Sequence, residues 1–205
     1  MEIIRDRKLV RDSWKLLKGD LEWLRRPGED GLLANFPAGD IIVPLSLWES
    51  RSDDLLAHPG RIGVWLDSDE QPERIFSHLA RFQLVAVNFP HFTDGRGYSI
   101  ARLLRERLGY KGELRAIGDV LRDQIYYLSR CGYDAFALRA DQNAEAALAA
   151  FDDFSEAYQT SVERPQPLFR RRLAAARAEN QPLRQDFDAL SRQVVEQAQQ
   201  QLQAA

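Results

Sequence analysis

Short apolar runs alternate with helix-periodic segments between residues 41 and 158. The runs are short and partly β-branched, which is typical of strands. The apolar residues of the segments between them recur every three or four positions, which is typical of helices. The predicted strands are Ile41–Leu47, Arg61–Leu66, Leu84–Phe89, Glu113–Ile117 and Ala135–Leu138. The predicted helices are Pro72–Phe82, Ser99–Leu108, Val120–Arg130 and Ala144–Tyr158.

This alternation predicts an α/β fold with a mostly parallel sheet of about five strands and flanking helices, because parallel neighbours need a helix-sized return between them. Both an open doubly wound sheet and a partial barrel-like sheet fit the pattern. Residues 1–18 predict an N-terminal β-hairpin, in which Ile3–Ile4 and Leu9–Val10 flank a charged turn. Pro44 favours an edge position for its strand, since proline donates no hydrogen bond to a neighbouring strand.

The composition changes after Pro165 and Pro167, so the predicted domains are an α/β domain at residues 1–164 and a helical C-terminal extension at residues 165–205. One apolar helix stripe runs along the extension, at Leu183, Phe187, Leu190, Val194, Ala198 and Leu202. Two interpretations stay open. The helix packs on its own domain, or it joins a partner or a second copy of the chain in a homo-oligomer.

Composition and charge exclude several classes of protein. The net charge is −3 and 29% of the residues are charged, so the basic field of a nucleic-acid binder is missing. No apolar run approaches the roughly 18 residues of a membrane span, and the charged N-terminus does not resemble a signal peptide. The single cysteine favours the reducing cytoplasm as the compartment.

The same cysteine count limits metal and redox chemistry. Cys131 alone cannot form an internal disulfide, a thiolate zinc site or a four-cysteine iron–sulfur cluster within one chain. His58, His78 and His91 lack the spacing of paired metal ligands, so we expect no metal site. We also expect no bound cofactor, because the chain carries neither a dinucleotide fingerprint nor a P-loop.

Candidate chemistry gathers where the predicted strands end, since ligands of parallel α/β sheets bind beyond the carboxyl ends of the strands. Asp67 and Ser68 follow one strand and Asn88 lies near the end of the next. Arg96, Arg122 and Arg139 also follow predicted strands. These three arginines predict a pocket for a small oxyanion or phosphate, because the guanidinium fork matches such groups. The predicted ligand-binding residues are Asp67, His91, Asp94, Arg96, Asp119, Arg122, Asp123, Arg139 and Asp141.

Each of these signals also has a purely structural interpretation. The glycines around Arg96 fit a tight turn, with Ser99 capping the following helix. Asp119 fits a helix cap, and Arg122 fits an ion pair with a carboxylate of a neighbouring strand-to-helix junction. The sequence leaves open which interpretation holds, and it identifies no catalytic residue.

Three segments resemble an uncharacterised bacterial family, DUF934. They read DGRGYSIARLLRER from Asp94, GELRAIGDVLRDQIYYLSRCGYDAF from Gly112 and RPQPLFRRR from Arg164. The resemblance covers about Arg61 to Arg172. Genes of this family lie beside those of assimilatory sulfite reductase, and its members are labelled as oxidoreductases of sulfite reduction.

The resemblance implies an accessory protein of sulfite reduction within sulfur assimilation. Sulfite reductase needs a four-iron cluster with four cysteine ligands, so a chain with one cysteine is not that catalytic subunit by itself. We therefore expect a non-catalytic partner of sulfite reductase or of another sulfur-assimilation protein. The alternative is a small enzyme, oxidoreductase or sensor that binds an anion or phosphate in the Arg/Asp pocket.

Overall fold

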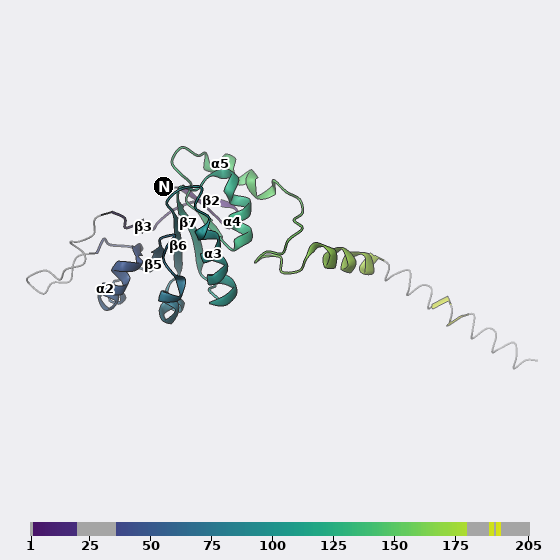
Figure 1. Cartoon of the computed structure of the whole chain (residues 1–205), viewed down its shortest axis with the longest axis horizontal. Helices are drawn as coiled ribbons and strands as arrows, with labels where there is room; N and C mark the ends of the chain where they lie inside the picture. The colour runs from purple at the N-terminus through teal and green to yellow at the C-terminus, as the bar shows by residue number, and fades with distance from the viewer. Residues whose placement is uncertain (1, 20–35, 180–188, 191, 194–205) are drawn as a thin grey trace, which may run out of the picture. The chain divides into compact units, whose positions relative to one another are not determined.

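Eight strands form one mixed sheet in the computed structural model, which describes residues 2–19, 36–179, 189–190 and 192–193 (Figure 1). The strands are β1 (Glu2–Arg5), β2 (Lys8–Arg11), β3 (Lys15–Leu16), β4 (Ile41–Pro44), β5 (Ile62–Leu66), β6 (Leu84–Phe89), β7 (Glu113–Gly118) and β8 (Ala135–Phe136). Their order across the sheet is β2-β1-β8-β7-β6-β5-β4-β3.

Helical segments connect the strands. They are α2 (Leu45–Leu56), the 3₁₀ helix η1 (Pro72–Arg81), α3 (Arg96–Arg102), the π-helical turn η2 (Leu103–Arg107), η3 (Arg122–Gln124), α4 (Ile125–Cys131), α5 (Ala144–Ala147) and η4 (Leu148–Asp152). The α/β class is confirmed.

The prediction of about five mostly parallel strands needs correction, because the sheet has eight strands and is mixed. Strands β3 to β8 run parallel, while β1 pairs antiparallel with both β2 and β8. The N-terminal hairpin is therefore part of the sheet. The count was too low because β3 has only two residues and the hairpin joins the sheet through a pairing of distant segments, at Ile4 with Phe136.

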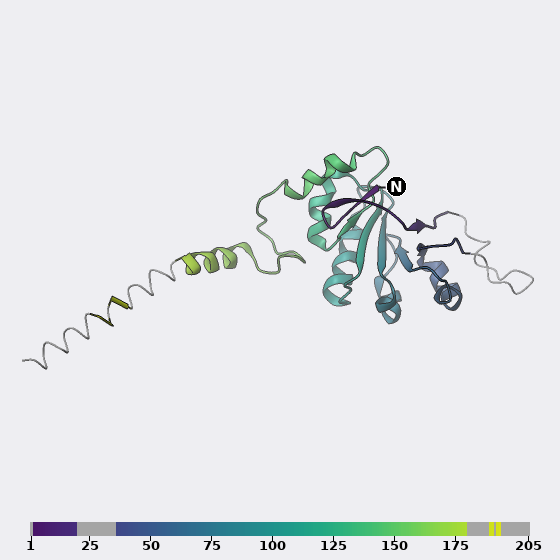
Figure 2. The same cartoon turned by 180° about the vertical axis from the view of Figure 1, so that it is seen from behind.

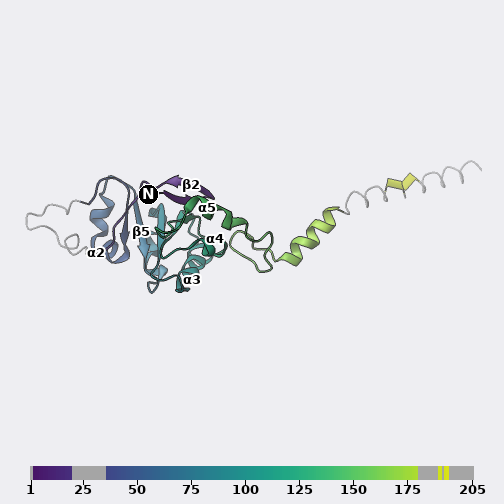
Figure 3. The same ribbon diagram turned by 90° about the horizontal axis from the view of Figure 1, so that it is seen from above.

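The helices cover one face of this sheet, which makes it a curled, partial-barrel sheet rather than a doubly wound one. From β3 to β8 each strand lies directly beside the one before it, so every right-handed crossover places its helix on the same face. Figure 3 shows α3 and α4 on one side of the strands and the β1–β2 hairpin on the other, and Figure 2 gives the view from behind.

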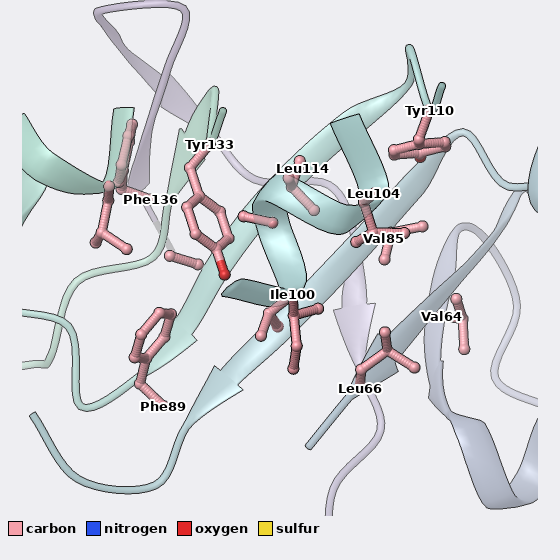
Figure 4. Packing of buried hydrophobic residues seen from close by; sticks show 14 of the residues in the cluster. Val64, Leu66, Val85, Phe89, Ile100, Leu104, Tyr110, Leu114, Tyr133 and Phe136 are labelled. Atoms are coloured by element: carbon pink, nitrogen blue, oxygen red, sulfur yellow. The ribbon is translucent and has the colours of Figure 1, made fainter. Parts of the chain in front are cut away.

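The main core lies between the helices and this face. Ile100 and Leu104 from the α3–η2 segment pack with Val85 and Leu114 from the two central strands, and all four are at most 5% exposed (Figure 4). Phe89 at the end of β6 continues this core and contacts the ring of Tyr98. Periodic apolar residues thus become one packed layer, as the pattern of the sequence predicts.

A smaller cluster covers the opposite face, where β6 contributes Leu84 and Ala86. Because β6 is buried on both faces, it reads as a continuous apolar run. This second cluster also holds a charged group. Arg115 is 1% exposed, and its guanidinium donates a 2.9 Å hydrogen bond to Asp12 in the segment after the hairpin. The ion pair fastens the N-terminal segment to the middle of the sheet.

Several predicted boundaries and one predicted strand position were wrong. Strand β4 ends at Pro44, and α2 begins at the next residue. In the sheet β4 lies second from the edge. The proline fits there because β3 pairs only with Ile41 and Ile42, so no donor is needed on that side. The helix predicted to start at Ser99 starts at Arg96, and the one predicted to end at Tyr158 ends at Asp152.

The chain divides into two compact units, residues 1–155 with 161–163 and residues 156–160 with 164–205. In the second unit, residues 168–179 are helical. Of the predicted apolar stripe only Leu190 lies among the described residues, and it is 60% exposed. None of the helices among the described residues is long and apolar enough to cross a membrane.

Candidate functional site

The carboxyl ends of the parallel strands gather most of the predicted residues on one surface. We call it the carboxyl-end surface, and it comprises Lys18 and residues 67–70, 88–96, 118–123 and 139–142. These segments follow β3, β5, β6, β7 and β8. Because these strands run in the same direction, their ends meet at one edge of the sheet.

A hydrogen-bonded chain joins three strand ends at this surface. Asp67, after β5, accepts a 3.0 Å hydrogen bond from the Asn88 side-chain amide near the end of β6. The oxygen of that amide accepts a 2.9 Å hydrogen bond from the Lys18 ammonium, which also lies 5.6 Å from the ring centroid of Trp65. Partial desolvation lowers the pKa of Lys18, while the charge of Asp67 opposes this shift.

Gly118 allows this chain to form. Its φ of +97° is in the left-handed region, and a side-chain carbon there would lie 2.4 Å from the Phe89 carbonyl oxygen and 2.7 Å from Asn88 Oδ1. Any larger residue would therefore push against the end of β6 and against the amide that holds Lys18.

Arg96 and Asp94 form a closed pair at the turn before α3. The guanidinium donates hydrogen bonds of 3.0 and 2.6 Å to the carboxylate, and the backbone amide of Arg96 adds one of 3.1 Å. The Arg96 guanidinium and the Ser68 hydroxyl hold the pKa of Asp94 well below its usual range. The turn is thus organised around its own aspartate.

Arg139 lies between two carboxylates after β8. It donates a 2.7 Å hydrogen bond to Asp119 and hydrogen bonds of 2.7 and 2.8 Å to Asp141. Arg139 lowers the pKa of Asp141 to about 2, and both carboxylates raise the pKa of the guanidinium. Asp119 does not cap a helix as the sequence suggested, because it accepts a 2.9 Å hydrogen bond from the backbone amide of Phe92.

Arg122 pairs with a carboxylate outside the carboxyl-end surface. Its guanidinium donates hydrogen bonds of 2.8 and 2.7 Å to Asp153, which follows η4 in the helical layer. The ion pair considered from the sequence therefore exists, but its partner lies 31 residues away and not at a neighbouring strand-to-helix junction. Asp123 and His91 are both exposed.

These contacts decide what the surface can do chemically. In each of Arg96, Arg122 and Arg139, a guanidinium nitrogen lies within 2.7 Å of a carboxylate oxygen. The nine predicted residues carry five carboxylates against three guanidinium groups. The surface is therefore acidic, and its guanidinium forks are already occupied by side chains of the same chain. The roles of these residues in binding a ligand remain predictions.

A cleft opens beside this surface, with a volume of about 740 Å³. Its lining comes from elements far apart in the sheet order, including Leu16 of β3, Ile117 of β7 and Ala137 just after β8. Strand β3 and the segment that follows β8 line one cleft because the sheet curls, and we call it the β3–β8 cleft. Glu2 and Glu145 also line it, as does Arg139.

Sequence reasoning missed Lys18 and its neighbour Trp65. Lys18 directly follows the apolar pair Leu16–Leu17, and that pair was the signal that a short strand ends there. Asn88 was noticed near a strand end but was not included among the predicted ligand-binding residues. Its position between Lys18 and Asp67 is a matter of three-dimensional packing.

Two features of the described part of the chain concern metal ligands and the thiol. Within those residues, no group of three or more His, Cys, Asp or Glu side chains is placed to hold a metal ion. Cys131 is buried in the main core, and burial raises the pKa of its thiol to about 11. Such a thiol is a packing residue rather than a nucleophile.

Residues 63–169 match the family model described as a bacterial protein of unknown function, DUF934. The match spans more than half of the 205 residues. It confirms the family that the sequence motifs indicated and leaves the activity open. No curated protein matches the chain.

Proposed function

We propose that this chain, which belongs to the DUF934 family, is a non-catalytic accessory protein of assimilatory sulfite reduction. It binds a protein component of that pathway through its carboxyl-end surface. The pathway comes from the family resemblance of the motifs. The role as a binding protein comes from the chemistry of the surface.

The observation that carries the proposal is the pairing of the three arginines with carboxylates of the same chain. A small anion such as sulfite would have to displace a carboxylate that is tethered to the same fold. A tethered group competes at an effective concentration of roughly millimolar or more. The excess of carboxylates also repels an anion, whereas a protein partner with basic groups gains from the same field.

The cysteine content supports an accessory role over a catalytic one. A four-iron cluster needs four cysteine ligands, and this chain offers one buried thiol. The reductase centre of the pathway therefore lies on another chain. What this protein contributes is a folded surface that such a chain recognises.

Growth and co-purification test the proposal together. A strain deleted for the gene should grow on sulfide but poorly on sulfate, and the intact gene should restore growth on sulfate. Tagged protein from sulfate-starved cells should recover a sulfite-reduction component. Equal growth on both sulfur sources, together with no recovered component, would remove the proposal.

A matched pair of variants locates the contact. Asp141→Lys reverses a charge on the carboxyl-end surface and should abolish recovery of the component. Glu106→Lys reverses a charge on η2, in an exposed pair with Arg102, and should leave recovery unchanged. Equal recovery with both variants would place the contact elsewhere on the protein.

A second candidate is a ligand-binding protein that uses Lys18. The Lys18 ammonium donates its hydrogen bond to the neutral Asn88 amide, which favours this site over the carboxylate-paired arginines for an anion. Thermal-shift measurements with sulfite, sulfate and phosphate would show it. A rise in melting temperature that Lys18→Met removes would favour this candidate over the first.

A further inference from the structure

The β3–β8 cleft has the surface of a docking site for an apolar side chain. Leu9, Leu16, Ile117 and Ala137 form its apolar wall. Its volume of about 740 Å³ can accept more than one side chain. Leu16 remains 37% exposed although it belongs to a strand, so the cleft leaves apolar surface open to a partner.

The rim of the cleft determines the charge of its occupant. Among the described residues of its lining, Glu2 and Glu145 are acidic and Arg139 alone is basic. The charge of Arg139 is outweighed by Asp119 and Asp141, which it binds. The two carboxylates of the lining and the two bound to Arg139 thus outnumber the one guanidinium of the lining. Such a rim attracts cations and disfavours anions.

The position of β3 favours a peptide over a small molecule. Among the described strands, β3 ends the sheet on this side. Because Leu16 of β3 belongs to the apolar wall, an extended segment in the cleft lies close to this strand. Extended segments bind at such edges by main-chain hydrogen bonds and place alternate side chains in adjoining pockets.

From these features we infer that the β3–β8 cleft binds an extended segment of a partner protein in which apolar side chains alternate with basic ones. The inference rests on the proposed function and adds the chemistry of the partner. The apolar wall takes the aliphatic side chains, and the rim carboxylates face the basic ones.

Two synthetic peptides test this chemistry without knowledge of the partner. One is acetyl-Arg-Leu-Arg-Leu-Arg-amide, and the other has glutamate in place of each arginine. Methyl NMR of the full chain should show saturable shifts at Leu16, Ile117 and Ala137 with the basic peptide and none with the acidic peptide. Raising the salt concentration should weaken this binding, since the attraction is partly ionic.

Variants assign the binding to the cleft. Glu145→Lys should weaken the basic peptide about fivefold or more, as expected when a rim charge is reversed. The matched control Glu73→Lys, on the exposed side of η1, should leave it unchanged. Leu16→Glu should abolish binding by placing a carboxylate in the apolar wall. If Leu16→Glu does not fold, the Glu145→Lys result still decides.

Four outcomes would overturn the inference. The basic peptide produces no saturable shift at the three cleft residues, or the acidic peptide binds equally well. Glu145→Lys binds the basic peptide as tightly as the unchanged protein does. Agmatine alone shifts the same methyl groups as strongly as the peptide, which would make the occupant a small organic cation.

Co-purification separates this inference from the proposed function. If the unchanged protein recovers a sulfite-reduction component and both Glu145→Lys and Leu16→Glu lose it, the two proposals hold together. If all three recover it, the cleft is not the contact and only the proposed function stands. If the peptide binds but the unchanged protein recovers no component, the cleft chemistry holds and the proposed pathway fails.

Discussion

The helix-covered face of the sheet and the carboxyl-end surface differ in how their residues find partners. On the helix-covered face, apolar side chains that recur with strand or helix period pack into one core. On the carboxyl-end surface, charged side chains meet partners that are up to 31 residues away for Arg122 and 70 residues away for Lys18. The first region follows from local pattern, whereas the second depends on the completed fold.

The largest effect is expected on the helix-covered face. Phe136 in β8 is 1% exposed and its ring centroid lies 5.5 Å from that of Phe151. Phe136→Ala should lower the free energy of unfolding by about 3–5 kcal/mol, because a large buried side chain is replaced by a cavity. Urea unfolding monitored by circular dichroism measures this. A loss below about 1 kcal/mol would show that this face is loosely packed.

Gly118→Ala should have the next largest effect, at the end of β7. The added methyl group would be strained by the left-handed φ and would clash with two close oxygen atoms. Together these effects should lower the free energy of unfolding by about 1–3 kcal/mol. Gly109→Ala is the matched control, because Gly109 has a φ of +68° but no atom within 4 Å of an added side-chain carbon. The control should lose less, and equal losses would mean that the Asn88 contact is unimportant.

Asn88→Ala should have a smaller effect, about 0.5–1.5 kcal/mol, which is typical of a lost side-chain hydrogen bond. The variant removes the amide that joins Lys18 to Asp67. We also expect the Lys18 ammonium to lose its fixed position, which the NMR signal of its Nζ group would report. An unchanged Lys18 signal would show that Trp65 alone holds the ammonium in place.

The smallest effect concerns pH. The pKa of Asp141 is about 2 in the folded protein, below the usual value of about 4. A lowered folded-state pKa stabilises the protein above about pH 4, and this contribution is lost as the pH falls toward 2. Arg139→Gln should raise the Asp141 midpoint toward 4 in a carbon-13 NMR titration. Arg107→Gln, an exposed arginine on η2, should leave it unchanged, and an unmoved midpoint in Arg139→Gln would contradict the ion pair.

Local pattern predicted the α/β class, the parallel central strands and the apolar residues that form the core. It also placed Asp67, Asp94, Asp119 and Arg139 near strand ends, where the structure has them. It could not show that β1 pairs with β8, because that pairing joins segments about 130 residues apart.

The same reason explains what the sequence left out at the candidate site. The oxyanion pocket was inferred from three arginines at strand ends, and the sequence does not reveal that Asp153 lies against one of them. Lys18 escaped notice because its strand is only two residues long. Ion-pair partners depend on tertiary geometry, whereas buried faces depend on periodicity, and only periodicity is visible in the sequence.

The central claim is that the arginines of the carboxyl-end surface are occupied by carboxylates of the same chain, so that small anions do not bind there. The most direct measurement is an NMR titration of the side-chain Nε–H signals of Arg96, Arg122 and Arg139 with sulfite. We predict distinct signals in the free protein and no saturable shift at millimolar sulfite. A saturable shift of these signals, lost in Arg96→Ala or Arg139→Ala, would contradict the claim.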